Sequence, residues 1–229
     1  MLKNPFKSLR KREWLIWGIS LFFVIISNIF SGKVSFVTFM GPVIGVTALI
    51  FVAVGNVWGQ ILSIVFATFY AISSWELKYY GEVITYLGMT APIALMSVFS
   101  WLKNPYEKGK SEVKIHRMKK SEIIVMFVLT ALVTFMFYFV LKFFNTASLI
   151  TSTVSIATSF LASYLMFYRN SYYAVAYALN DVVLMVLWII ASIKDSVYIP
   201  VLMCFIVFFI NDIYGFISWK IREKKQRLI

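Results

Sequence analysis

Two Asn-Asp pairs, Asn180-Asp181 and Asn211-Asp212, stand inside long apolar stretches of this sequence. A carboxylate or amide placed among apolar residues loses its contacts with water, so it needs a partner or a function. Amides donate and accept hydrogen bonds, which suits sugar hydroxyl groups, and a carboxylate favours a nearby positive charge. The two pairs therefore predict a site for an uncharged or cationic solute that carries hydroxyl groups.

Other polar and aromatic residues join these pairs if the stretches are helical. Tyr177 and Trp188 share the helical face of Asn180, and Tyr214 shares that of Asn211. Aromatic rings at such positions stack on a flat heterocycle or attract a positively charged one. In the first half of the chain Gln60 and Thr90 are the comparable polar positions. The predicted substrate-binding residues are Gln60, Thr90, Asn180, Asp181, Trp188, Asn211, Asp212 and Tyr214.

The same residues also have a purely structural interpretation. Polar side chains often join helices by hydrogen bonds inside a membrane, and Tyr or Trp often mark its interfaces. Asp181 and Asp212 would then pair with neighbouring helices. The charged and aromatic segment 75–82 is interpreted as an outer interfacial loop, in which Glu76 and Glu82 are candidates for attracting a cation.

Motifs for catalysis and cofactor binding are not found in this sequence. It lacks the HExxH zinc motif, the GxSxG nucleophile turn and the glycine-rich phosphate loop. The single cysteine, Cys204, excludes an internal disulfide, and His116 has no metal-binding partners near it in the sequence. We therefore expect neither an enzyme nor a bound cofactor or metal.

The composition indicates which elements must position the site. Hydrophobic residues make up 61% of the 229 residues and charged residues only 14%, whereas soluble domains carry about 25% charged residues. Because lipid offers the backbone no hydrogen-bond partners, helices are the expected elements. We predict an all-α, polytopic membrane protein with eight transmembrane helices at residues 14–31, 34–54, 57–73, 83–101, 121–141, 147–167, 172–193 and 197–219. Pro92 is expected to bend the fourth of these.

The positive charge is concentrated in three blocks, at residues 3–12, 103–120 and 220–227, which hold 17 of the 22 Lys and Arg residues. Four predicted spans separate each block from the next, so all three face one side. By the positive-inside rule that side is the cytoplasm, and both termini lie there. The net charge of +12 is thus assigned to anionic lipid and not to nucleic acid.

A faint internal repeat appears at the cytoplasmic ends of two spans. Ser100-Trp101 and Ser218-Trp219 each close a set of three consecutive spans before positive charge. The predicted organisation is a basic N-terminus and extra first span (1–33), a three-helix bundle (34–102), a basic loop (103–120), a connector span (121–146), a second three-helix bundle (147–219) and a basic tail (220–229). The two bundles keep the same direction in the membrane, as in SWEET-type transporters.

Several short motifs together resemble the PnuC family of nicotinamide riboside transporters. They are Lys78-Tyr79-Tyr80-Gly81-Glu82, Pro92 ahead of Trp101, Lys103-Asn104, Tyr168-Arg169-Asn170, the Asp181…Trp188 spacing, and Asn211-x-x-Tyr214-Gly215 ahead of Trp219-Lys220. One departure is that Tyr172 and Tyr173 stand where many members carry tryptophans. The resemblance covers the second to eighth spans.

The resemblance implies a SWEET-like core and uptake of nicotinamide riboside by facilitated diffusion for NAD synthesis. It places the chain in the bacterial cytoplasmic (inner) membrane, with a cytoplasmic ribosylnicotinamide kinase as metabolic partner that traps the solute by phosphorylation. Sister transporters of this fold carry thiamine or deoxynucleosides, and a membrane enzyme or a substrate-capture subunit is the more distant alternative. The sequence leaves open whether the chain forms a homo-oligomer.

Overall fold

The computed structural model describes residues 4–30, 36–76, 80–107, 111–146, 148–195 and 198–228, and these form helices joined by short turns. The predicted turn at 31–33, Lys78 and Tyr79 of the 78–82 motif, and Ala147 and Val197, where two spans were predicted to begin, lie outside the described residues. The α-helices are α1 (Lys11–Phe30), α2 (Phe36–Ala53), α3 (Trp58–Glu76), α4 (Tyr80–Thr85), α5 (Ala91–Lys103), α6 (Lys120–Phe143), α7 (Leu149–Phe167), α8 (Tyr173–Lys194) and α9 (Ile199–Arg227).

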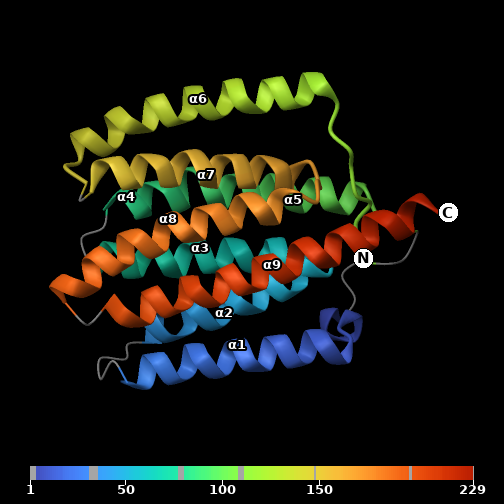
Figure 1. The fold of residues 1–229 in the computed structure, drawn as a ribbon, viewed down its shortest axis with the longest axis horizontal. Coiled ribbons are helices and arrows are strands. Elements are labelled where there is room, and N and C mark those ends of the chain that lie inside the picture. The colour runs from blue at the N-terminus through green and yellow to red at the C-terminus, as the bar shows by residue number, and fades with distance from the viewer. Residues whose placement is uncertain are drawn as a thin grey trace.

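The helices lie side by side with their long axes roughly aligned (Figure 1). Within the described residues, six apolar helical segments are long enough to cross a membrane, and α4 and α5 share one of these, Tyr80–Lys103. The apolar part of α2, Phe39–Ala53, is shorter. The described chain is thus an all-α, polytopic membrane protein, as its composition predicted.

A π-helical turn, Tyr86–Thr90, joins α4 to α5. Pro92 follows at the start of α5. Proline removes a backbone donor and crowds the preceding turn, and a π-turn relieves such crowding by widening the helix. A π-turn thus lies just before Pro92, the residue at which a bend was predicted.

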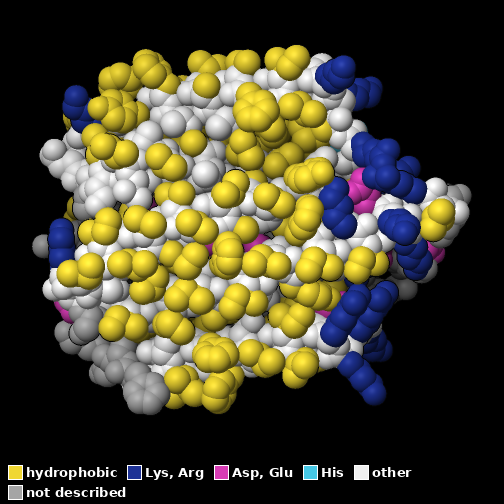
Figure 2. Space-filling view, in the orientation of Figure 1, with side chains coloured by type: hydrophobic (Ala, Val, Ile, Leu, Met, Phe, Trp, Pro, Cys, Tyr) yellow, Lys and Arg dark blue, Asp and Glu magenta, His cyan; other side chains and the backbone are white. Residues whose placement is uncertain are grey.

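The outer surface suits a lipid environment along its sides and water at its ends. Only 11% of the apolar window of α6 is buried, although its mean hydropathy is 2.6, and an apolar surface of this kind suits contact with lipid. Figure 2 shows hydrophobic side chains along the side of the molecule and Lys and Arg gathered at one end. The start of α1 and the end of α9 lie at that same end (Figure 1).

Two turns at this basic end share one hydrogen-bond pattern. After α2, the N–H groups of Gly55 and Asn56 donate to the carbonyls of Val52 and Phe51 over 2.8 and 2.9 Å. After α7, the N–H groups of Arg169 and Asn170 donate to Met166 and Leu165, each over 2.9 Å. This is a Schellman motif, which needs a left-handed residue, and φ is 70° at Gly55 and 57° at Arg169.

Each turn also uses its asparagine to start the next helix. The Oδ1 atom of Asn56 accepts the N–H of Trp58 at 3.1 Å, and the Oδ1 atom of Asn170 accepts the N–H of Tyr172 at 3.0 Å. The side chains thus satisfy backbone donors that a helix start leaves open. The two turns are therefore equivalent in these three hydrogen bonds.

Two buried tryptophans tie the two halves of the molecule together near these turns. Trp101, at the end of α5, donates its indole N–H to the carbonyl of Met166 in α7 over 3.2 Å. Trp219, on α9, donates to the carbonyl of Val52 in α2 over 2.9 Å. Their ring centroids are 5.6 Å apart. Each indole therefore satisfies a carbonyl near the end of a helix in the other half.

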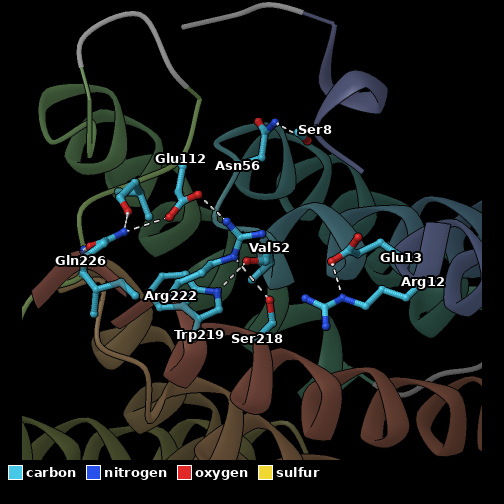
Figure 3. A network of polar contacts seen from close by, with 12 residues as sticks. Ser8, Arg12, Glu13, Val52, Asn56, Glu112, Ser218, Trp219, Arg222 and Gln226 are labelled. Atoms are coloured by element: carbon cyan, nitrogen blue, oxygen red, sulfur yellow. Dashed lines mark hydrogen bonds and ion pairs between the residues drawn. The ribbon is translucent and has the colours of Figure 1, made fainter. Parts of the chain in front are cut away.

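The described part of the basic loop between α5 and α6 lies across both turns. The N–H of Val113 donates to the carbonyl of Gly55, and that of His116 to the carbonyl of Arg169, each over 3.0 Å. Glu112 forms an ion pair with Arg222 on α9 (Figure 3). This segment holds the basic ends of the two halves together.

Candidate functional site

A cavity lies between two groups of three spans, which we call the first set (α2, α3 and α4–α5) and the second set (α7, α8 and α9). Its wall contains five of the predicted site residues: Gln60, Thr90, Asn180, Asp181 and Asp212. These come from α3, the π-turn, α8 and α9. Tertiary packing therefore brings together polar residues that are far apart in the sequence.

Two carboxyl groups are the dominant charges in this cavity. Asp181 and Asp212 are each 4% exposed, and their side chains lie next to each other. The Oδ2 atom of Asp181 has no hydrogen-bond partner in the described part of the chain. Adjacent carboxylates repel each other unless a proton or another positive charge lies with them. The pair is therefore suited to a cation.

Asn180 is held in one orientation by hydroxyl groups of α7. Its Oδ1 atom accepts hydrogen bonds from Thr158 at 2.9 Å and Ser159 at 3.0 Å, with Ser155 at 3.4 Å. An asparagine whose oxygen is occupied in this way presents its NH₂ group as a donor. The cavity is thus offered an amide donor beside two carboxylate acceptors.

The first set contributes fewer polar atoms to the wall. Gln60 is 2% exposed, and its Nε2 atom has no hydrogen-bond partner among the described residues. A buried donor without a partner costs free energy, so a solute acceptor at this position would relieve that cost. Thr90 adds a hydroxyl from the π-turn.

Three predicted site residues lie outside this cavity. Asn211 donates to Ser20 on α1 over 2.9 Å, and the hydroxyl of Tyr214 donates to Glu13 on α1 over 2.6 Å. Trp188 lines a separate, smaller cavity with Tyr70. Asn211 and Tyr214 therefore face α1, and of the three predicted aromatic residues only Tyr177 lies in the wall that holds Asn180.

Four serines that were not predicted as site residues also line the cavity: Ser63 and Ser97 from the first set, and Ser159 and Ser163 from the second. Ser163 also shares a hydrogen bond of 3.0 Å with the hydroxyl of Tyr177. A signal for the two serines of the second set exists in the sequence, because Ser155, Ser159 and Ser163 recur every four residues. Such spacing places small polar side chains on one face of a helix.

Glu82 corrects the interpretation of segment 75–82 as an interfacial loop. Glu82 is only 3% exposed and belongs to α4. Helix α4 begins at Tyr80 and packs on α3, which carries this carboxyl inward, beside Tyr70. The sequence predicted an interfacial loop for this charged residue, whereas the packing of α4 buries it.

Aromatic side chains bound the cavity toward the end opposite the basic turns. Phe66, Tyr86, Phe205 and Phe208 all belong to its wall. Phe66 lies 5.4 Å from Phe208 and 6.0 Å from Tyr86 between ring centroids. Val52 and Met166, whose carbonyls accept the two indole N–H groups, line the other end. The polar residues thus lie between an aromatic layer at one end and Val52 and Met166 at the other.

Comparison with known proteins identifies the family. Residues 35–221 match the model of a family described as nicotinamide mononucleotide transporter. The chain belongs to this family. It is therefore a membrane transporter and not an enzyme, and the resemblance to the PnuC family seen in the sequence is confirmed.

Individual relatives of this transporter support the assignment. It is 22% identical over 189 residues to a protein of Neisseria mucosa named nicotinamide riboside transporter PnuC, covering 81% of this chain and 72% of the relative. Its fold matches a crystal structure titled as that of the vitamin B3 transporter PnuC, with a TM-score of 0.82 and 20% identity, over 95% of this chain and 94% of the other. The family description names a mononucleotide, whereas the relative's name specifies a riboside.

Proposed function

We propose that this transporter lets nicotinamide riboside cross the membrane by facilitated diffusion, supplying NAD synthesis. The observation that carries the proposal is the contact between Asp181 and Asp212 in a cavity whose described wall contains no Lys or Arg. Nicotinamide riboside combines a flat, positively charged ring with a neutral ribose, and this cavity offers carboxylates for the ring and amides and hydroxyls for the sugar.

The same electrostatics favour the riboside over the mononucleotide. A phosphate brings negative charge next to two carboxyl groups, and no basic side chain of the described wall would balance it. Burying an unpaired charge at membrane depth is costly. Of the two solutes named by the family description and the relative, the riboside is the one that this wall suits.

The proposed roles follow the chemistry of each side chain. Asp181 and Asp212 favour the positive ring, while Tyr86 and Tyr177 contribute aromatic surface to the wall. Asn180 donates to an acceptor of the solute, since α7 occupies its oxygen. Gln60 and Thr90 hydrogen-bond the solute from the first set. Asn211, Tyr214 and Trp188 have no place in this inner site.

The proposed arrangement in the membrane has eight spans in a one, three, one, three order. Helix α1 is the extra span and α6 the connector, and the two equivalent turns and exchanged tryptophan bonds support a parallel repeat of the two sets. Both termini and the basic loop face the cytoplasm of a bacterium, because the basic side chains gather at that end. Rocking of one set against the other would give alternating access. A cytoplasmic ribosylnicotinamide kinase would then trap the solute as its charged phosphate.

Transport by the purified chain in liposomes tests the function. Labelled nicotinamide riboside should equilibrate without exceeding the outside concentration, and excess unlabelled riboside should compete at least about 100-fold better than the mononucleotide, a difference of about 2.7 kcal/mol. Equal competition by the two would overturn the proposed solute. Accumulation driven by a proton or sodium gradient would overturn facilitated diffusion. Competition by thiamine or a deoxynucleoside alone would point to a sister transporter.

Topology has its own test. A single cysteine placed at Ser111 in the basic loop, in a Cys204→Ser background, should resist an impermeant thiol reagent in intact cells and react after permeabilisation. A cysteine placed at Asp195, beyond the opposite end of α8, is the matched control and should react in intact cells. Labelling at Ser111 from outside would contradict the eight-span arrangement.

A further inference from the structure

A second, smaller cavity lies on the far side of the aromatic layer from the Asp pair. Tyr70 and Ser74 of α3, Trp188 of α8 and Cys204 of α9 line it. Phe66 belongs to the walls of both cavities. Ser74 and Trp188 lie toward the ends of α3 and α8 that are remote from the basic turns. By the proposed orientation this cavity is the outer one.

Buried polar groups surround this outer cavity without full hydrogen bonding. Ser74 is 1% exposed, and its Oγ atom has no hydrogen-bond partner among the described residues. Glu82, 3% exposed, lies directly beside Tyr70, and its Oε2 atom also has no partner in the described part of the chain. A carboxyl group buried in this way is expensive unless a positive charge reaches it.

The walls of the outer cavity supply the other half of a cation site. The rings of Tyr70, Trp188 and Phe66 line it, and Tyr198 lies 5.8 Å from Trp188 between ring centroids. Aromatic faces attract organic cations through their electron-rich centres, and several faces around one space form the cages that bind quaternary nitrogen. None of the described residues lining the cavity is basic.

Two tyrosines in contact, Tyr70 and Tyr86, connect the walls of the two cavities. Tyr86, which lines the inner cavity, lies within electrostatic range of both Glu82 and Asp181. The ring of Tyr86 contacts that of Tyr70, with 4.3 Å between centroids. The rings of Tyr70 and Tyr86 thus lie between the outer cavity and the inner one.

We propose that Tyr70, Ser74 and Trp188, with Glu82 beside them, form an outer subsite for an organic cation, where the pyridinium ring of the solute binds before it enters the inner cavity. This inference rests on the proposed function for the identity of the solute. It also gives Trp188 and Glu82 a role in recognising the charged ring, on the approach and not in the inner site. A solute with an uncharged ring gains nothing from this subsite.

The test compares two solutes in Glu82→Gln, which removes the charge and keeps the shape. In liposomes, the concentration for half-maximal uptake of nicotinamide riboside should rise about tenfold, in the range of cation–aromatic and charge effects. The concentration for half-maximal uptake of the reduced form, dihydronicotinamide riboside, should change less than about twofold, because its ring is neutral. Trp188→Leu should likewise raise the concentration for half-maximal uptake more for the cationic solute than for the neutral one. Glu122→Gln on α6 lies outside both cavities and should affect neither.

Equal impairment of both solutes in Glu82→Gln would show a structural role and overturn the subsite, and so would unchanged kinetics for both. A wild-type protein that carries neither solute would refute the proposed function instead. Calorimetric binding of the 1-methylnicotinamide cation would then decide the subsite, because it needs neither ribose nor transport. Weaker binding in Glu82→Gln would support the subsite, and binding equal to wild type would overturn it.

Discussion

The two three-helix sets share their backbone chemistry but not the surfaces that they present to the cavity. In the register fixed by the equivalent turns, Gly45 matches Ser159, Leu49 matches Ser163 and Phe66 matches Asn180, and all six residues line the cavity. In the register of the two tryptophans, Ala94 matches Asp212, and both line it again. At these positions the first set is apolar and the second polar, whereas Ser63 and Tyr177 are both polar, and at the pair Thr90 and Phe208 the polar residue belongs to the first set.

This contrast separates what holds the molecule together from what recognises the solute. The turns and indole bonds satisfy backbone groups that no lipid can satisfy, so both sets must keep them. Side chains that face a cavity are free of that requirement. Both carboxyl groups of the cavity and its oriented amide, Asn180, are on the second set, and we expect that set to contribute more of the free energy of binding.

The largest effect should come from removing the charge of the second set. In the double variant Asp181→Asn, Asp212→Asn, binding of nicotinamide riboside should weaken by about 2–5 kcal/mol, the cost of losing a buried charge partner. The neutral dihydro form should lose much less, which separates loss of charge from misfolding. Calorimetry on the folded variant measures both. Equal losses for the two solutes would show that the carboxyl pair does not select the positive ring.

Two asparagines offer a matched pair for the next effect. Asn180→Ala should weaken binding by about 1–3 kcal/mol, because it removes a donor that α7 holds toward the cavity. Asn211→Ala is the control, since Asn211 bonds to Ser20 on α1. The affinity of this variant for nicotinamide riboside should stay within about twofold of the parent, or about 0.4 kcal/mol. A greater loss of affinity in Asn211→Ala than in Asn180→Ala would show that the solute binds between α9 and α1 and not in the proposed cavity.

Polar residues of the first set should matter less. Thr90→Val keeps the shape of the side chain and removes one neutral hydroxyl, which is worth about 0.5–1.5 kcal/mol. Gln60→Leu should fall in the same range. Titration with nicotinamide riboside measures both losses. If either exceeded that of Asn180→Ala, the proposed asymmetry between the sets would be wrong.

The shared features of the two sets should respond alike. Trp101→Phe and Trp219→Phe each remove one indole donor and leave one helix carbonyl without it, so each should lower the free energy of unfolding by about 1 kcal/mol. Thermal unfolding in one detergent compares them. A large difference between the two variants would show that the equivalent hydrogen bonds are not equivalent in energy, while similar values support a repeat.

The sequence by itself determined the class of protein and the positions of most helices. Long apolar stretches in a chain with so few charged residues form transmembrane helices, because lipid offers no hydrogen-bond partners to the backbone and a helix satisfies these groups within itself. The span predicted at 121–141 is α6, Lys120–Phe143, and the one predicted at 34–54 is α2, Phe36–Ala53. Because burying polar groups in a membrane is costly, the sequence also predicted Asn180 and Asp212 as site residues.

Only the tertiary structure decided which of the marked residues face one another. Asn211 and Asp212 are adjacent in the sequence, yet Asn211 bonds to α1 and Asp212 lines the cavity. Glu82 was assigned to a loop and is buried in α4. Helical periodicity fixes the angles between side chains on one helix, but the direction of the partner helix sets their environment. That direction comes from packing between residues far apart in the chain, which no local pattern contains.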